Sequence, residues 1–162
     1  MFGYHLLKVG KLSQAINSDD SPIKHQISVG KDSPLVSVTA EQTDLPFAEH
    51  SIDVALLAHT LDFSSDPHQV LREIHRILIA NGHVILTGFN PISLCGVARL
   101  IPSDKFPLIK EARLFRPARV RDWLQLLGFE ILDEQRYIYS SLMSKNNSYG
   151  PKFESREIGR AH

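Results

Sequence analysis

The segment from Ile52 to Phe89 limits the fold more than any other part of the chain. Ser51 to Ala58 is a near-continuous apolar run, which is typical of a strand buried on both faces of a sheet. Asp66 and Pro67 follow, and they suit the N-cap and the first position of a helix. His83 to Phe89 is the next apolar strand. Strand, helix and strand in this order predict a right-handed crossover between parallel strands, and therefore an α/β fold.

The helix that begins at Pro67 carries one apolar stripe, as expected for a helix packed on a sheet. The stripe consists of Val70, Leu71, Ile74, Ile77 and Leu78. We expect the helix to end at Asn81-Gly82, with Gly82 in the left-handed conformation common after helices. A second helix is predicted from Pro117 to Gly128, and Phe129 to Tyr139 is then predicted as a strand.

The N-terminal part predicts short strands and little helix. Tyr4 to Val9 is a buried strand that ends at Gly10, and at most Leu12 to Ile16 makes one helical turn. His25 to Val29 and Leu35 to Thr39 alternate between apolar and polar residues. Only a short turn-forming sequence separates them, which predicts an antiparallel hairpin instead of a parallel crossover.

Length and composition indicate one domain of ordinary globular type. The chain has 162 residues, and we predict a domain over residues 1–145 and a loose tail over 146–162. The single cysteine, Cys95, favours a reducing, cytoplasmic setting. No apolar run approaches the length of a membrane span, and the first residues do not resemble a secretory signal.

Charge and histidine spacing argue against two classes of function. The formal net charge is zero, which disfavours a polyanion-binding domain, although residues 99–121 hold seven basic and two acidic residues. Such a cluster is more often a solvated face, so nucleic acid is not the expected partner. His68 and His75 are seven residues apart, too far for one metal ion, and we predict no metal site.

Ordered motifs in the middle of the chain resemble one known family. The chain contains, in order, DLPFAEHSIDV, AHTL, DP, LREI, RIL and NGHVIL, and later LLGFE. This series closely resembles the class I S-adenosylmethionine-dependent methyltransferases, type 11 subgroup, over residues 39–89. The resemblance implies a three-layer Rossmann-like sheet, here reduced in its N-terminal half by the predicted hairpin.

The resemblance also implies a cofactor, S-adenosylmethionine, and positions that contact it. Glu41 stands where the family has an aspartate that meets the adenine amino group, and Gln42 offers backbone contacts to the ring. Ala58 and His59 end the next strand beside the methionine portion of the cofactor. Asn90 would face the methyl acceptor.

The family's Gly-rich loop and its following acid are only partly kept. Gly10 remains after the first strand, but the other alternate glycines are missing. Asp32 is the candidate acid for the ribose hydroxyls, although a turn residue is the ordinary role of an aspartate in such a sequence. Asp62 and Phe63 stand where the family has a Glu-His pair.

The leading hypothesis is therefore methyl transfer from S-adenosylmethionine to a small-molecule acceptor, with His59 in the acid–base or orienting role. The alternative is a degenerate domain without cofactor, which serves as an interaction or oligomerisation module. Missing helices would leave apolar sheet surface for a second copy to cover, so a homo-oligomer is one expectation. A third reading is an N-terminally short piece of a complete enzyme, in which Met1 is an internal residue.

Overall fold

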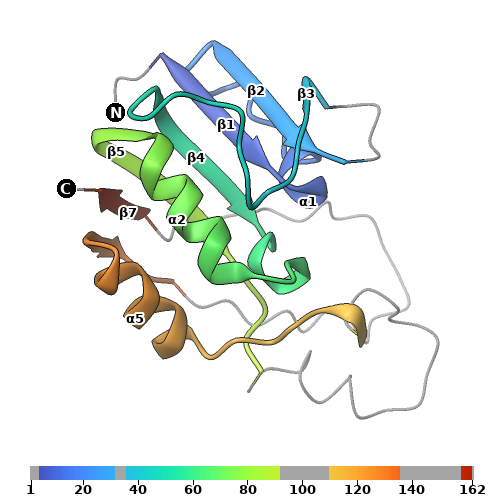
Figure 1. Cartoon of the computed structure of the whole chain (residues 1–162), viewed down its shortest axis with the longest axis vertical. Helices are drawn as coiled ribbons and strands as arrows, with labels where there is room; N and C mark the ends of the chain where they lie inside the picture. Colours follow the sequence, from blue (N-terminus) through green and yellow to red (C-terminus); the bar gives the residue numbers. More distant parts are fainter. Residues whose placement is uncertain (1–3, 32–35, 92–109, 136–157, 162) are drawn as a thin grey trace.

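The computed structural model describes residues 4–31, 36–91, 110–135 and 158–161, and of the last range the backbone alone. Within these residues the strands form one sheet of order β3-β2-β1-β4-β5-β7-β6 (Figure 1). The strands are β1 (His5–Val9), β2 (His25–Gly30), β3 (Val38–Thr39), β4 (Ile52–Ala58), β5 (Leu78–Thr87), β6 (Phe129–Asp133) and β7 (Ile158–Ala161). The helices are α1 (Lys11–Gln14), the 3-10 turn η1 (Leu61–Phe63), α2 (Pro67–Ile77) and α5 (Pro117–Leu126).

Strands β1 to β5 are mutually parallel, and β7 is antiparallel to both of its neighbours, β5 and β6. The α/β fold and the β4–α2–β5 crossover are therefore confirmed. Since β1, β2 and β4 run in the same direction, their carboxyl ends lie at one edge of the sheet, where α/β sheets bind ligands.

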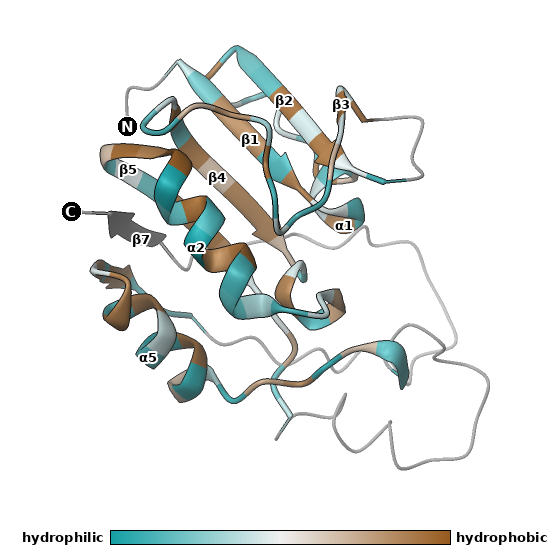
Figure 2. Cartoon of the chain, in the orientation of Figure 1, coloured by the Kyte–Doolittle hydropathy of each residue, from teal (hydrophilic) through white to brown (hydrophobic). Residues whose placement is uncertain are grey.

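Helices α2 and α5 cover one face of the sheet, and the main core lies beneath them (Figures 1 and 2). The apolar stripe predicted for α2 is buried as expected. Trp123 and Leu124 of α5 join the same core, together with Leu7 and Leu57 from the central strands. A smaller apolar cluster contains Leu6, Ile23, Val54 and Leu56. No helix of the described ranges is long and apolar enough to cross a membrane.

The predicted hairpin between the second and third strands is wrong. β2 and β3 are parallel, with Val29 opposite Val38 and Gly30 opposite Thr39. A parallel connection needs about a dozen residues where the chain must run back along a strand of ordinary length. β3 has two residues, so a shorter connection is enough.

The predicted helix end at Gly82 is also wrong. α2 ends at Ile77, and Asn81 and Gly82 lie within β5, where Asn81 takes the left-handed conformation with φ 62°. The free carbonyls at the helix end accept hydrogen bonds from the backbone N–H groups of His50 and Ser51, at 3.1 and 2.8 Å. A segment distant in sequence thus caps the helix, and no glycine is needed there.

The end of the chain differs from the expected loose tail at residues 158–161, which form β7 inside the sheet. The boundary predicted at residue 145 and residues 99–109 of the basic cluster lie outside the described residues. At the second helix the prediction holds: α5 begins at Pro117, and Gly128 follows it with φ +87°.

Candidate active site

Gly10 marks the point where the ends of β1, β2 and β4 meet. Its φ is +88°, a conformation that side chains disfavour, and its N–H donates to Val29 O at 3.0 Å. A Cβ at this position would lie 3.1 Å from Thr60 Oγ1 and 3.2 Å from Gln42 Nε2. The structure thus brings Gly10 and Gln42 together, although 32 residues separate them in sequence.

Two hydroxyl groups join the ends of β1 and β4. Ser13 Oγ donates to Val9 O at 2.6 Å and accepts from the N–H of Ala58 at 2.7 Å. Thr60 Oγ1 donates to the same carbonyl of Val9 at 2.6 Å. Sequence reasoning missed both residues; the available signal was a hydroxyl residue shortly after each of two buried strands. Ala58 contributes its backbone to this network, and its side chain is buried.

Gln14 fills the space between the ends of β1 and β2. Its side chain is buried, and Nε2 donates to Val29 O at 3.2 Å. Its carbonyl oxygen Oε1 is also buried and has no hydrogen-bond partner within the described part of the chain. A buried acceptor without a donor is rare in folded proteins.

The loop after β3 holds Glu41 at the surface, where its carboxylate forms an ion pair with Lys31. A hydrogen bond from the N–H of Asp44 to Glu41 O, at 3.2 Å, tightens the loop into a turn. Lys31 follows β2 directly, so the ion pair spans the edge of the sheet beyond β2 and β3. Asp32, the predicted ribose-binding acid, lies outside the described residues.

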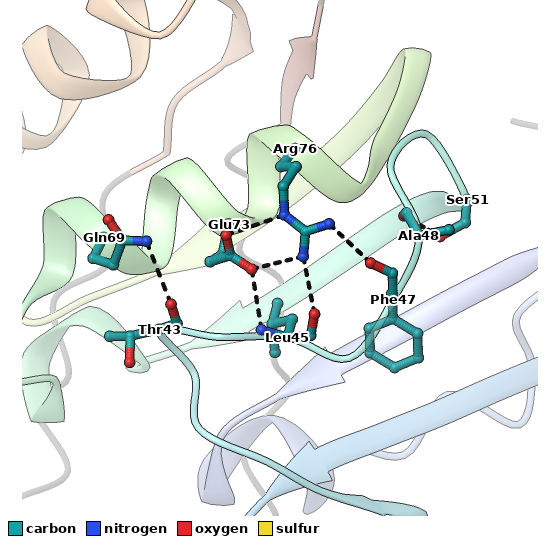
Figure 3. A network of polar contacts seen from close by, with 8 residues as sticks. All are labelled: Thr43, Leu45, Phe47, Ala48, Ser51, Gln69, Glu73 and Arg76. Atoms are coloured by element: carbon teal, nitrogen blue, oxygen red, sulfur yellow. Dashed lines mark hydrogen bonds and ion pairs between the residues drawn. The ribbon is translucent and has the colours of Figure 1, made fainter.

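Two charged residues of α2 fix the next part of this loop (Figure 3). Glu73 Oε2 accepts from the N–H of Leu45 at 3.0 Å and from Arg76 Nη2 at 2.8 Å. Arg76 also donates to the carbonyls of Leu45 and Phe47, each at 2.9 Å. The hydrogen bonds from Arg76, with a smaller contribution from Leu45, lower the pKa of Glu73 despite its partial burial. The loop that begins at Glu41 is therefore anchored to a helix of the core.

His59 directly follows β4 and lies against the buried carboxylate of Asp62. Its backbone has φ 54°, and its N–H donates to Thr87 O at 3.0 Å. His59 Nδ1 lies 2.9 Å from Asp62 Oδ2, and the same oxygen accepts from the N–H of Phe89 at 3.0 Å. Burial is the main cause that raises the pKa of Asp62, and the bonds from His59 and Phe89 oppose it. Because Asp62 occupies Nδ1, this contact leaves the other ring nitrogen of His59, Nε2, unengaged.

The surroundings of this pair are aromatic on one side and open on another. The rings of His59 and Phe89 are 4.1 Å apart between centroids and tilted by 31°. Asn90, the predicted acceptor-side residue, follows Phe89 directly and is half-buried. An open pocket of about 410 Å³ adjoins Asp62; its lining consists of Asp62, Phe63, Ser64, Ser65, Glu111 and Arg113. Across the described ranges, no three His, Cys, Asp or Glu side chains are grouped as metal ligands would be.

The comparisons with known proteins agree with this architecture. The family described as "Methyltransferase domain" matches residues 5–86, and the chain belongs to that family. The Escherichia coli (strain K12) protein named "Uncharacterized protein YafS" is 44% identical over 137 residues, which are 85% of this chain and 57% of that protein. The chain thus spans little more than half the length of this relative.

Two solved structures share this fold. A Thermotoga maritima structure described as a "SAM-dependent methyltransferase, possible histamine N-methyltransferase" is 27% identical, with a TM-score of 0.64 over 80% of this chain and 65% of that chain. The structure of the [4+2]-cyclase SpnF has a TM-score of 0.65 at 20% identity, over 82% of this chain and 53% of that chain. The family predicted from the motifs is confirmed, and S-adenosylmethionine is the cofactor that this membership implies.

The residues at the sheet edge have the chemistry that this cofactor requires. Gly10 places backbone without a side chain at the end of β1, and Glu41 offers an exposed carboxylate for an amino group. The orphaned acceptor of Gln14 suits a hydroxyl donor. Gln14 lies four residues after Gly10, at one of the alternate positions where the family has glycine.

Proposed function

We propose that this chain is the catalytic domain of a methyltransferase that transfers the methyl group of S-adenosylmethionine to an O–H or N–H group of a small molecule. The observation that supports this most directly is the hydrogen bond of 2.9 Å between His59 and Asp62 at the carboxyl end of β4. Family membership supplies the donor, and this pair supplies a proton acceptor beside the place where ligands of α/β sheets bind.

Methyl transfer requires few catalytic side chains, and the protein forms no covalent intermediate with the substrate. The bound cofactor supplies an electrophilic methyl group on a sulfonium, and transfer is an in-line displacement that depends mainly on positioning. His59 Nε2 takes the proton of the acceptor as the new bond to carbon forms, and the electron pair of the broken C–S bond stays on sulfur. Asp62 fixes the ring orientation through Nδ1 and stabilises the cationic ring that results.

The proposed contacts follow the sequence predictions. Gly10 and Ala58 line the cofactor side through their backbone, and Glu41 and Gln42 face the adenine. Asn90 contacts the acceptor. Support comes from the proximity of Gly10 to Gln42 and from the anchoring of the Glu41 loop by Glu73 and Arg76.

A thermal melt with and without S-adenosylmethionine and its demethylated product tests cofactor binding. Ligand at about 100 times its dissociation constant adds about 2.7 kcal/mol, which raises the melting temperature by roughly 5–10 °C for a domain of this size. The matched variant is His59→Gln, which should keep this rise and lose turnover. No rise with either ligand at millimolar concentration would refute the proposal.

A second candidate is a domain that has lost the cofactor and serves as an interaction module. Two observations favour it: the Gln14 side chain stands where the family has glycine, and Glu41 is already paired with Lys31. Two results together would support this candidate over the enzyme. The chain would associate in sedimentation experiments, and neither ligand would change its melting temperature.

A further inference from the structure

One hydrogen bond defines the orientation of the Gln14 carboxamide. Only its nitrogen takes part in that bond. Nε2 faces the carbonyl oxygen of Val29 at 3.2 Å, and only the N–H₂ end can bond to a carbonyl. The opposite atom, Oε1, is therefore the carbonyl oxygen. It is buried and has no partner among the residues that the structure describes.

Gly30 leaves the space that the Gln14 carboxamide occupies. The φ of Gly30 is not in the left-handed region, so its backbone conformation does not require glycine. A Cβ on Gly30 would lie 2.6 Å from Gln14 Nε2, closer than Cβ atoms come to other atoms. The absence of a side chain at the end of β2 thus makes room for the carboxamide.

The missing partner of Oε1 must be a hydrogen-bond donor at the carboxyl ends of β1 and β2. This is the edge at which ligands of parallel α/β sheets bind, and Gly10 and Gln42 lie at the same edge. A neutral amide oxygen accepts from hydroxyl or N–H groups and repels acceptors such as phosphate oxygens. A sugar hydroxyl fits this requirement.

We propose that Gln14 Oε1 accepts a hydrogen bond from a ribose hydroxyl of the bound nucleoside, so that Gln14 is a specificity residue for the ligand's sugar. This rests on the proposed function. Oε1 has almost no exposed surface, so the side chains that cover it must move when the hydroxyl enters.

The test measures binding by calorimetry, with S-adenosylhomocysteine, its 2′-deoxy and 3′-deoxy analogues, and adenosine as probes. The variant is Gln14→Met, which keeps the length and apolar stem but loses both polar atoms. Gln26→Met is the matched control, because the Gln26 carboxamide is already partnered by Ser18 on both sides, at 2.6 and 2.9 Å. Melting temperatures without ligand show that each variant is folded.

We expect the unchanged chain to prefer S-adenosylhomocysteine over one deoxy analogue by about tenfold, the size of one hydrogen bond. Gln14→Met should lose about tenfold in affinity and lose this preference, whereas Gln26→Met should keep both. Equal affinity and equal preference in Gln14→Met would overturn the sugar contact while the proposed function stands. Tighter binding by Gln14→Gly than by the unchanged chain would overturn it too, since Gln14 would then obstruct the site. Absence of binding of both S-adenosylhomocysteine and adenosine would overturn the contact and the proposed function together.

Discussion

Arg76 Nη2 lies 2.8 Å from Glu73 Oε2 on α2, and both side chains also bind the backbone of the loop that enters β4. The pair therefore acts on the loop as well as on the helix (Figure 3). Gln69, one turn earlier, donates to Thr43 O at 3.4 Å and adds a third attachment. One face of α2 thus fixes the course of the chain from Thr43 to Phe47.

Glu73→Gln should destabilise the chain by about 1–3 kcal/mol, because it weakens the bond to Arg76 and leaves Arg76 without its counter-charge. The folded-state pKa of Glu73 is lowered, so its stabilisation is present above its unfolded pKa and is lost as pH falls through the folded value. Urea unfolding at several pH values measures this. Arg72→Gln, at an exposed position on the same helix, is the control and should change little. A Glu73→Gln chain as stable as the parent at pH 7 would contradict the anchoring role.

Gly10→Ala and Gly128→Ala separate backbone strain from crowding. Both glycines have a positive φ, +88° and +87°, so both variants lose roughly 1 kcal/mol or more from strain. At Gly10 the new Cβ also meets Thr60 and Gln42 within 3.3 Å, whereas nothing lies within 4 Å at Gly128. We expect Gly10→Ala to be the more destabilising of the two in a thermal melt. Equal losses would mean that Thr60 and Gln42 move aside without cost.

Asp62→Asn tests the buried carboxylate through the pH dependence of stability. Because burial raises the pKa of Asp62, the folded chain keeps the Asp62 proton up to a higher pH than the unfolded chain does. The stability of the unchanged chain relative to Asp62→Asn is therefore highest below the unfolded pKa of about 3.9 and falls as pH rises through the raised value. Unfolding midpoints of both chains across this range give the difference. A difference that does not vary with pH would show that the carboxylate is not penalised by burial.

His59→Gln and Asp62→Asn should both reduce turnover more than cofactor affinity, by at least tenfold for His59, since proton transfer contributes about 10²–10⁴-fold where it is required. Single-turnover rates and calorimetry on the same preparations separate the two effects. If His59→Gln turns over at the parental rate, the acceptor loses its proton to another group or directly to water.

Asp66→Ala should destabilise α2 by about 1 kcal/mol, because Asp66 Oδ1 accepts from the N–H of Gln69 at 3.0 Å as an N-cap. Asp122→Ala, at an exposed position in α5, is the matched control and should have a smaller effect. The comparison of melting temperatures measures both.

Local sequence predicted the elements whose signals are local. The apolar run of β4, the cap at Asp66, the stripe of α2 and the end of α5 before Gly128 all depend on residues within one or two turns of each other. The order of motifs also predicted the family and its cofactor, because spacing along the chain is a property of the sequence.

Contacts between distant segments decided the rest. α2 ends at Ile77 because the backbone of His50 and Ser51 caps it. The local sequence of the helix alone predicts an end at Gly82 instead. β3 is parallel to β2, with Val29 opposite Val38 and Gly30 opposite Thr39, and this register is a contact between two separate segments.

The candidate site divides in the same way. The sequence by itself determined which residue types stand at the strand ends: Gly10, Glu41, Gln42 and His59. Only the tertiary structure placed Asp62 against His59, paired Lys31 with Glu41 and left Gln14 Oε1 without a donor. Hydrogen bonds and burial depend on distances between atoms, and those distances are set when the sheet assembles.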